Sequence, residues 1–314
     1  MNVYKMSDKT TLAIINPASA GGKTAKKAGE IVSKLETVID GSLLVRETTK
    51  SLDATDFSFE AVRNGISSFI VIGGDGTIQE AVNGILNSQN WNDCELGIVN
   101  SGTGHGFVQS IGLPESLEEQ IRIAASGISK TVDLGHISFK DFDGKENSKF
   151  FINESQLGIG GAVVQRVGKN HKLLGGKLAF GLTTIETVFR HPNQLLEYEI
   201  NNEMIIKHNC TGLVIANGAY CGGGMNLAPG AIVDDGELDL LIMENLSLTE
   251  RFKGFSKIYS GKHIHLQKFN LRRVQSLSIT SDEIVLVEAD GELLGTTPCD
   301  IKIIPGAIKV RYRI

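Results

Sequence analysis

The sequence predicts an α/β domain followed by a mainly antiparallel, β-sandwich-like domain, with the active site in the cleft between the two. Two observations lead to this fold class. Up to about Asp133, short apolar runs alternate with amphipathic runs of helical spacing, which is the pattern of a doubly wound α/β domain. After Val132 the runs become mainly strand-like. We therefore expect an α/β domain over residues 1–133 and a β-rich domain over residues 134–314.

The N-terminal elements follow from the spacing of apolar residues. Phe69 to Ile72 is short, β-branched and free of polar residues, as expected of a strand that is covered on both faces. Ile78, Val82 and Ile85 then recur at helical spacing. By these criteria we expect strands at 11–16, 42–48, 69–72 and 96–99, and helices at 23–39, 53–64, 77–88, 104–111 and 115–126.

The second half contains strand-like runs with a few helical exceptions. We expect strands at 196–200, 237–243, 277–280 and 284–287, and helices near 160–168, 176–190 and 248–260. The segment 301–314 alternates between apolar and polar residues after Pro305-Gly306, which predicts a C-terminal hairpin.

The composition is that of a soluble globular protein. Hydrophobic residues make up 41% and charged residues 21% of the 314 positions, and no apolar run approaches the roughly 20 residues of a membrane span. The N-terminal segment lacks an apolar signal core, so we expect a cytoplasmic location. The net charge of −5 disfavours general nucleic-acid binding. The four cysteines are widely spaced, which disfavours a disulfide scaffold and a structural zinc site.

Two long stretches contain basic but no acidic residues. Residues 251–281 contain Arg251, Lys253, Lys257, Lys262, Lys268, Arg272 and Arg273, and residues 155–185 contain Arg166, Lys169, Lys172 and Lys177. Such stretches can form a surface for anionic lipid headgroups, at about 1 kcal/mol per basic residue near the membrane. Ordinary solvated faces are the alternative.

The run from Ser68 to Leu86 joins a buried strand to a helix through glycines at 73, 74 and 76, with Asp75 among them. Glycines allow backbone N–H groups to approach a ligand, and a helix N-terminus favours negative charge, so the run predicts a phosphate site. A carboxylate there can hold Mg²⁺ on the phosphates or accept a proton from an attacking hydroxyl. The alternative is an ordinary helix N-cap. The spacing matches neither GxxxxGK[ST] nor GxGxxG.

Two similar turns follow other strands of the predicted sheet. Asn100-Ser101-Gly102-Thr103-Gly104 follows the strand at 96–99, and Asn16-Pro17-Ala18-Ser19-Ala20-Gly21-Gly22-Lys23 follows the first strand. Parallel strands direct their carboxyl ends to one edge of the sheet, where open α/β sheets bind ligands. The three turns together indicate a nucleotide cleft.

The order of these motifs resembles the catalytic-domain family of diacylglycerol kinases, in particular its soluble bacterial lipid-kinase branch, to which sphingosine and ceramide kinases are related. The motifs are NPxS and GGK at 16–23, VIGGDGTxxEAVNG at 71–84, LGIVNSGTG at 96–104, VDLG at 132–135, and DGELD and ADGELLG late in the chain. The resemblance extends from about Thr11 to Tyr312. GGDGT alone also occurs in NAD kinases and phosphofructokinases, whereas the full ordered set is much more specific.

The resemblance implies a kinase of lipid metabolism and phospholipid biosynthesis. Such a kinase transfers the γ-phosphate of ATP to a lipid hydroxyl, of diacylglycerol or a related lipid such as a long-chain base, with Mg²⁺ as cofactor. It also implies an NAD-kinase/diacylglycerol-kinase-like fold in which residues 1–133 bind nucleotide, residues 134–314 bind the lipid, and the C-terminal strand can return to the first domain. Peripheral contact with the inner membrane face and a homodimer are further expectations.

Site residues follow from the same resemblance. Asp75 and Glu292 match catalytic carboxylates, either of which can take the proton, and Asp235 matches a region that binds a structural Mg²⁺ in relatives. Nucleotide-contacting positions are matched by Asn16, Thr48, Gly73, Gly74, Gly76, Thr77, Glu80, Gly102 and Thr103. Plain turns at Asp290-Gly291 and at Asp234-Asp235-Gly236 are the alternatives in the second domain.

One loop departs from the family pattern. Bacterial diacylglycerol kinases usually continue it as GTxNDFAR, whereas here the Asn, Asp and Arg positions are His105, Gly106 and Gln109. The missing Asp normally belongs to an acidic network with the positions of Asp75 and Asp133, so either that network is rebuilt or the acceptor differs. Two other functions remain open: a soluble-metabolite kinase of the NAD-kinase type, which shares GGDGT, and a nucleotide-binding regulatory protein with a degenerate site, which draws only on this loop departure.

Overall fold

The computed structural model describes residues 10–102, 104–174 and 177–313. The chain divides into two compact units. Unit 1 contains the chain up to Leu134 together with Pro305–Ile314, and unit 2 contains Gly135–Ile304. Each unit is described below by itself.

A parallel sheet forms the centre of unit 1. Its strands are β1 (Thr10–Ile15), β2 (Ser42–Glu47), β3 (Ser68–Gly73) and β4 (Glu95–Asn100), in the order β4-β3-β1-β2. The central strands β1 and β3 are apolar and almost wholly buried, because helices cover both of their faces. These strands lie within a residue of their predicted positions.

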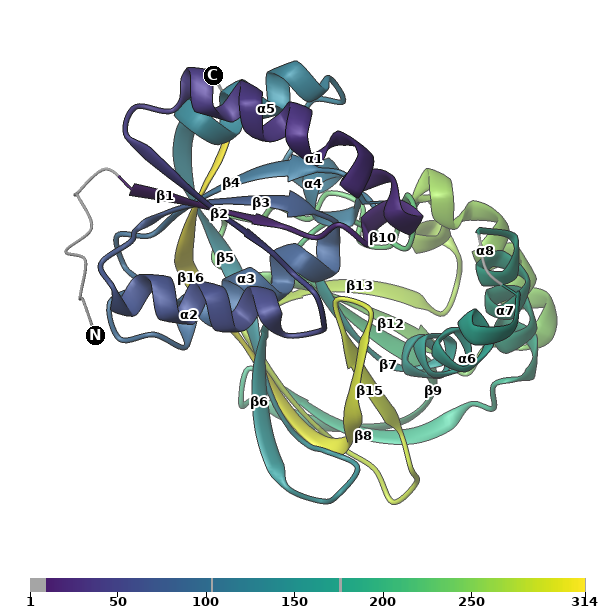
Figure 1. Ribbon diagram of the computed structural model, residues 1–314. Coiled ribbons are helices and arrows are strands. Elements are labelled where there is room, and N and C mark those ends of the chain that lie inside the picture. Colours follow the sequence, from purple (N-terminus) through teal and green to yellow (C-terminus); the bar gives the residue numbers. More distant parts are fainter. Residues whose placement is uncertain (1–9, 103, 175–176, 314) are drawn as a thin grey trace. The chain divides into compact units, whose positions relative to one another are not determined.

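Helices form a layer on each face of this sheet (Figure 1). Helices α1 (Ser19–Val38) and α5 (Leu117–Ser126) lie on one face, and α2 (Asp53–Arg63) and α3 (Asp75–Leu86) on the other, while α4 (Gly106–Ser110) is a short helix after β4. Residues 20–22 of α1 have positive φ, so the regular helix begins at Lys23 as predicted. The predicted α/β architecture is confirmed.

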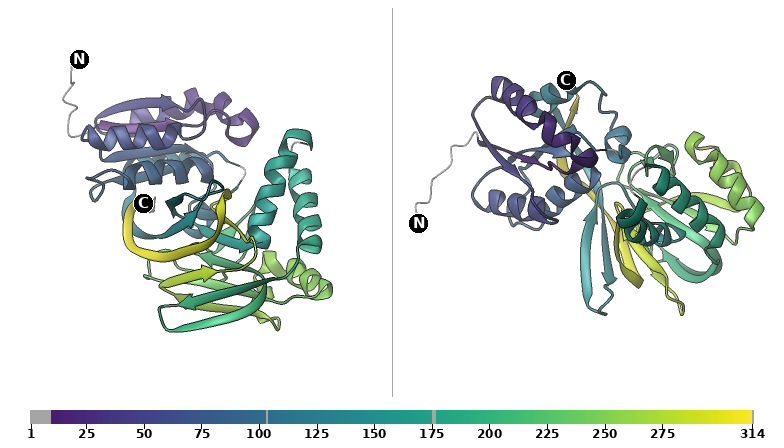
Figure 2. Two further views of the ribbon diagram at one scale, coloured as in Figure 1. Left: turned by 90° about the horizontal axis from the view of Figure 1, so that it is seen from below. Right: turned by 45° about the vertical axis from the view of Figure 1, so that its right-hand side comes forward.

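Unit 2 is mainly antiparallel. Its strands are β5 (Ile128–Lys140), β6 (Glu146–Phe151), β7 (Glu154–Gly158), β8 (Gln194–Ile200), β9 (Met204–Ala216), β10 (Tyr220–Cys221), β11 (Met225–Asn226), β12 (Leu238–Glu244), β13 (Phe269–Val274), β14 (Ser276–Thr280), β15 (Leu286–Ala289) and β16 (Glu292–Arg313), of which β5 begins and β16 ends in unit 1. Helices α6 (Ile159–Leu174) and α7 (Lys177–Arg190) lie side by side, and α8 (Leu248–Lys257) is followed by the 3₁₀ turns η1 (Ile258–Ser260) and η2 (Lys262–His265) (Figure 2).

Two long strands join the layers of this sandwich. Strand β9 pairs with β8 through its first half and with β7 through its second half, and β16 pairs with β15 and then with β14. Because β14 also pairs with β8, the strands β7, β15, β16, β14, β8 and β9 close into a ring. The ring encloses an apolar core that includes Phe151, Leu213 and Ile279.

The predicted C-terminal hairpin is wrong. Strand β16 continues without a turn through Pro305-Gly306 to Arg313. Gly306 adopts a φ of +57°, and its backbone N–H donates to Oδ1 of Asp133 at 2.7 Å. Residues Lys309 to Arg311 then pair in parallel with β4. The alternating pattern therefore reflects one long strand that returns to unit 1.

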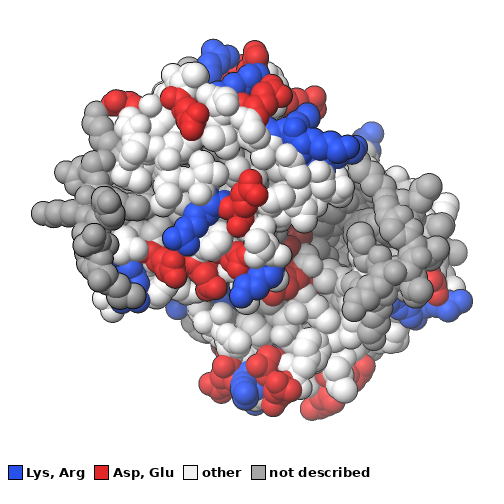
Figure 3. All heavy atoms as spheres, viewed as in Figure 1, with Lys and Arg blue, Asp and Glu red and all other residues white. Residues whose placement is uncertain are grey.

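No helix in the described part of the chain is both long and apolar enough to cross a bilayer. On the described part of the face in Figure 3, acidic and basic side chains are interspersed.

Arg311 fastens the end of β16 within unit 1. Its guanidinium donates to Oε2 of Glu95 from Nε at 3.0 Å and from Nη2 at 2.8 Å. It also donates to the carbonyl of Ala124 at 2.9 Å and to Oγ of Ser68 at 3.1 Å. The side chain is only 10% exposed, so these acceptors replace the water that it gives up.

We predict that Arg311→Ala lowers the free energy of unfolding of unit 1 by roughly 2–3 kcal/mol, because it leaves the Ala124 carbonyl and Glu95 without their donor. Urea unfolding followed by circular dichroism measures the change. The control is Lys309→Ala, whose partner Asp93 lies 4.0 Å away and is 95% exposed. This control should change stability by less than about 0.5 kcal/mol. Equal effects of the two substitutions would contradict the assignment.

Candidate functional site

The loops that follow β3 and β4 approach each other through their glycine backbones. A Cβ atom built on Gly102 would lie 2.5 Å from the Cα of Gly74, and one built on Gly74 would lie 3.1 Å from the Cα of Gly102. Gly73 is equally restricted, since its Cβ would lie 2.7 Å from the Cβ of Thr77. Only glycine fits such contacts, and backbone N–H groups at such a place can reach a ligand closely.

Asp75 lies at the junction of these two loops. It is the first residue of α3, and the N-cap position belongs to Gly74, so the interpretation of Asp75 as an ordinary N-cap is wrong. Its Oδ2 instead accepts a hydrogen bond from the backbone N–H of Gly106 in the other loop at 3.3 Å. A Cβ on Gly104 would lie 2.5 Å from the same oxygen. The second glycine loop therefore packs directly on the carboxylate.

The other carboxylate oxygen of Asp75 is buried and has no hydrogen-bond partner among the described residues. Burial raises the pKa of Asp75, and the N–H of Gly106 opposes that shift. Leaving a buried carboxylate oxygen unpaired is costly, so a functional reason for it is expected. A cation or a hydroxyl donor would satisfy this atom, and Mg²⁺ prefers oxygen ligands of this kind.

The first predicted turn joins the same site. Nδ2 of Asn16 donates to Oγ1 of Thr77 at 2.9 Å, and Oδ1 of Asn16 accepts from the N–H of Ala18 at 3.0 Å. Oγ1 of Thr24 donates to Oγ of Ser101 at 2.9 Å. The three loops that the sequence singled out are therefore linked to one another within unit 1.

The remaining predicted nucleotide contacts are placed less tightly. Thr48 follows β2 and donates its N–H to the carbonyl of Ile15 at 2.8 Å. Glu80 lies in α3 and accepts from Oγ of Ser51 at 3.4 Å. A Cβ on Gly76 would meet no atom within 4 Å, so this position is open. Thr103 lies outside the described residues. The nucleotide-binding roles of all these residues remain predictions.

The loop that departs from the family pattern contacts Asp75 through its backbone. The N–H of Gly106 donates to Oδ2 of Asp75, and this donor does not depend on the side chain at position 106. Nδ1 of His105 lies 2.5 Å from Nδ2 of Asn100, and Oδ1 of Asn100 accepts from the N–H of Gly102. Whether the acidic network is rebuilt or the acceptor differs remains open.

In unit 2, Asp290 and Gly291 form the two-residue turn between β15 and β16. Both have positive φ, +48° and +80°, as in a type I′ hairpin turn. The carboxylate of Asp290 accepts from the N–H groups of Ile152, Asn153 and Glu154 at 2.8, 2.9 and 3.1 Å. The turn interpretation is confirmed, and Asp290 fixes the turn to the segment between β6 and β7.

Two glutamates flank this turn. Glu292 is half exposed and forms an ion pair with Lys149 of β6. Glu288 is fully buried, accepts from the N–H of Gly291 at 2.9 Å, and has no partner for Oε1 among the described residues. Burial raises the pKa of Glu288 to about 8, and the negative charge of Asp290 adds to the shift. The role of Glu292 as a base remains a prediction.

Asp235 is less well suited to a cation than Asp75. Its Oδ1 accepts from the N–H of Glu237 at 3.1 Å, and its Oδ2 lies 3.4 Å from Nη1 of Arg273. The described residues contain no group of three or more His, Cys, Asp or Glu side chains that could hold a metal. The carboxylate of Asp235 is thus paired with the guanidinium of Arg273. A role of Asp235 in binding a metal stays a prediction.

Sequence reasoning missed Lys149, Glu288 and the contact of Gly104 with Asp75. Lys149 and Glu292 are 143 residues apart, and no local pattern links them. Glu288 lies inside a short apolar run. An acidic residue in such a run is rare, and this was the signal that could have indicated a buried carboxylate.

Both halves of the chain match known families. Residues 10–137 match the model of the diacylglycerol kinase catalytic domain, and residues 156–312 match the YegS C-terminal NAD kinase beta sandwich-like domain. A protein named probable lipid kinase YegS-like from Citrobacter koseri is 30% identical over 85% of both chains, and one from Yersinia enterocolitica is 29% identical over 96% of both. The diacylglycerol kinase of Bacillus subtilis is 26% identical over 92% of both.

Solved structures share the fold. A diacylglycerol kinase from Bacillus anthracis superposes with a TM-score of 0.73 at 21% identity, covering 97% of both chains. Yeast NADH kinase in complex with NADH gives 0.54 at 13% identity, covering 96% of this chain and 82% of that one. The family model and the relatives define a phosphotransferase of the lipid-kinase class, and the solved structures show that it has the expected fold. The chain belongs to the diacylglycerol kinase catalytic-domain family, which confirms the resemblance, the fold class and the prediction of a kinase.

We predict that Asp75→Asn lowers kcat by at least about 10²- to 10⁴-fold, the usual cost of losing a general base, and that lost cation positioning adds to this. Asparagine preserves the shape of the side chain, so thermal stability should be unchanged. A steady-state kinase assay with a thermal melt checks both. Wild-type turnover would contradict the assignment, and a large loss of stability would favour a structural role.

We also predict that Gly102→Ala impairs catalysis, because its methyl group would clash with the Cα of Gly74 and force the loops apart. We expect kcat/KM for ATP to fall by roughly tenfold or more, since small displacements in a phosphate site are expensive. The control is Gly29→Ala in α1, where a Cβ meets no atom within 4 Å. The control should retain full activity, and equal activity of both variants would contradict the prediction.

A third prediction concerns Glu288 and pH. Because its pKa is raised in the folded state, the unfolded chain releases this proton from about pH 4.5 upward while the folded chain keeps it until about pH 8. Stability should therefore fall as pH rises through this window. We expect Glu288→Gln to remove that loss, gaining roughly 3 kcal/mol relative to wild type between pH 5 and pH 8. Urea unfolding at both pH values measures this difference in the free energy of unfolding, with Glu203→Gln, at an exposed position, as the control. If the free energy of unfolding of Glu288→Gln and of wild type changed with pH in parallel, the prediction would be refuted.

Proposed function

We propose that the chain transfers the γ-phosphoryl group of ATP to the hydroxyl of a membrane lipid, with Mg²⁺ as cofactor. The observation that carries this proposal is the buried, unpartnered Oδ1 of Asp75 at the junction of two glycine loops. The site offers closely packed backbone groups for phosphates and one bare carboxylate oxygen. Family membership supports ATP as the phosphate donor and a lipid as the acceptor class.

In this mechanism the loops after β3 and β4 bind and orient the triphosphate through backbone N–H groups. Mg²⁺, held in part by Asp75, would neutralise charge on the phosphates. The lipid hydroxyl attacks the γ-phosphorus, the bond from that phosphorus to the bridging oxygen breaks, and ADP leaves. The hydroxyl proton passes to a carboxylate, either Asp75 or Glu292.

Binding measurements separate the two carboxylates. If Glu292 is the base, Glu292→Gln lowers kcat without changing the affinity for MgATP. If Asp75 holds the cation, Asp75→Asn weakens MgATP binding relative to metal-free ATP. A Glu292→Gln variant with unchanged kcat would leave Asp75 as the acceptor of the proton.

A phosphorylation screen tests the function itself. The purified chain is incubated with γ-labelled ATP, Mg²⁺ and separate vesicles of diacylglycerol, a long-chain base or ceramide, or with NAD in solution. We expect label in a lipid product and none in NADP. Label in NADP alone would favour the NAD-kinase alternative, and no label in any acceptor would contradict the proposal.

The acceptor preference is predicted to depend on Gly106. A carboxylate at this position would place a like charge beside Asp75, whose Oδ2 already contacts the Gly106 N–H. We expect Gly106→Asp to lower kcat/KM on the true acceptor without improving it on diacylglycerol. The exposed Gln109→Asp controls for added charge. Best activity on diacylglycerol in both wild type and Gly106→Asp would defeat the idea of a different acceptor.

We also propose peripheral contact with the membrane, since the acceptor resides there. The basic stretches at 155–185 and 251–281 remain the candidate surfaces, although the side chains of Lys169, Lys172 and Lys177 lie outside those described. A homodimer is a further proposal, for which sedimentation velocity is the test.

A further inference from the structure

The outer side of α8 and η1 exposes large apolar residues next to lysines. Leu248, Phe252 and Tyr259 are 59%, 62% and 57% exposed. Lys253, Lys257 and Lys262 are also exposed, and the one acidic residue between 247 and 262 is Glu250, which is 29% exposed and pairs with Lys268. These six side chains, three apolar and three basic, are called the α8 face below.

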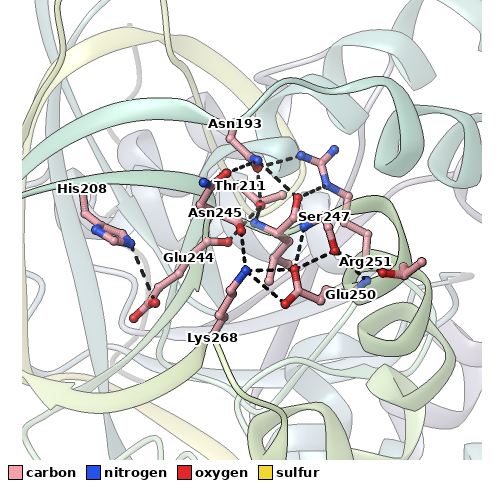
Figure 4. Close-up of polar contacts among 11 residues, drawn as sticks. Asn193, His208, Thr211, Glu244, Asn245, Ser247, Glu250, Arg251 and Lys268 are labelled. Carbon is pink, nitrogen blue, oxygen red and sulfur yellow. Dashed lines mark hydrogen bonds and ion pairs between the residues drawn. The ribbon is translucent and has the colours of Figure 1, made fainter.

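The helix beneath this face is firmly anchored. Arg251, on the inner side of α8, is only 5% exposed and donates to the carbonyls of Val188, His191 and Leu246. Its Nη2 also donates to Oδ1 of Asn193 (Figure 4). The N-terminus of α8 has a capping box between Ser247 and Glu250. Oε1 of Glu250 also lies 3.0 Å from Nζ of Lys268.

These contacts correct one sequence expectation. Arg251, counted among the lipid-facing basic residues, is buried, and burial lowers its pKa. Lys268 pairs with Glu250, and Arg273 pairs with Asp235 and Glu237. Within residues 251–281, the exposed basic side chains for which no ion pair is seen are therefore the three lysines of the α8 face and Arg272.

We propose that the α8 face docks on the surface of an anionic lipid bilayer. Leu248 and Phe252, four residues apart, lie on one side of the helix and would enter the headgroup region together with Tyr259. Lys253, Lys257 and Lys262 would contact the anionic headgroups. The inference rests on the proposed action on a membrane lipid, and it names the surface that brings the enzyme to that lipid.

Charge favours a bilayer over a second copy of the chain. A two-fold contact through the α8 face would bring lysines of both copies together, and the one carboxylate of α8, that of Glu250, is already paired with Lys268. An anionic bilayer offers the opposite charge to the lysines and an apolar layer to Phe252. The anchored inner side means that the helix can bind without refolding.

Co-sedimentation of the full chain with vesicles, in the absence of ATP, tests the proposal. We expect binding to mixed phosphatidylcholine and phosphatidylglycerol vesicles, weaker binding to phosphatidylcholine alone, and loss at high salt. Phe252→Ser should weaken binding by roughly tenfold or more. Lys253→Gln and Lys257→Gln should each weaken it about fivefold.

Matched controls lie elsewhere on the surface. Ile205 is 62% exposed, as Phe252 is, so Ile205→Ser tests the loss of any exposed apolar residue. Lys26→Gln and Lys27→Gln remove exposed lysines of α1. These controls should bind vesicles as the wild type does, and losses equal to those of the α8 variants would overturn the proposal.

A tryptophan reporter tests insertion directly. The chain has one tryptophan, Trp91. In a Trp91→Phe background, Phe252→Trp should be quenched by brominated lipids and Ile205→Trp should not. Equal quenching at both positions, or none at Phe252→Trp, would contradict docking through α8. A second copy of the chain would instead be shown to cover this face if two results came together. The wild type would form a dimer that Phe252→Ser abolishes, and the wild type would not bind vesicles.

The failure of docking is distinguishable from the failure of the proposed function. If the chain phosphorylates vesicle lipid while Phe252→Ser binds and reacts as the wild type does, the docking surface is wrong and the function stands. If vesicles bind through α8 but no lipid is phosphorylated, docking stands and the function is wrong. On a water-dispersed short-chain lipid, Phe252→Ser should keep wild-type activity.

Discussion

The candidate site depends on one close contact between two backbones, at Gly74 and Gly102. Because these positions lack side chains, the loops after β3 and β4 can come into contact, and their backbone polar groups lie close to Asp75. That contact places Asp75 against Gly104 and Gly106 of the neighbouring loop. Oδ1 of this carboxylate is buried and has no hydrogen-bond partner among the described residues, although the charge of His105 opposes the rise in the pKa of Asp75. An unpaired buried carboxylate oxygen is expensive in a folded chain unless a ligand completes the site.

A second constraint acts from the far end of the sequence. Strand β16 begins with Glu292 in unit 2 and ends beside β4 in unit 1, where Arg311 is buried against Glu95. The N–H of Gly306 on this strand donates to Asp133 on β5. The sheet that carries the glycine loops is thus completed by the last residues of the chain, so its stability depends on contacts more than 200 residues apart in sequence.

The sequence predicted what local patterns determine. Apolar spacing located the strands of unit 1, and glycines after them located the loops, because both signals lie within a few adjacent residues. Long-range contacts were not predictable in this way. The partner of Asp75 is 31 residues away. The sequence predicts a surface position for Arg251, which is buried against carbonyls of Val188 and His191. It also predicts a turn at Pro305-Gly306, where the N–H of Gly306 instead donates to Asp133 and the strand continues to pair with β4 from Lys309.

The most direct test of the central claim is a crystal structure of the chain with Mg²⁺ and a non-hydrolysable ATP analogue. We expect the triphosphate to lie within hydrogen-bond distance of backbone N–H groups in the loops after β3 and β4, with Mg²⁺ or an ordered hydroxyl donor at Oδ1 of Asp75. A triphosphate bound away from both loops, with Oδ1 of Asp75 still unpartnered, would contradict the account.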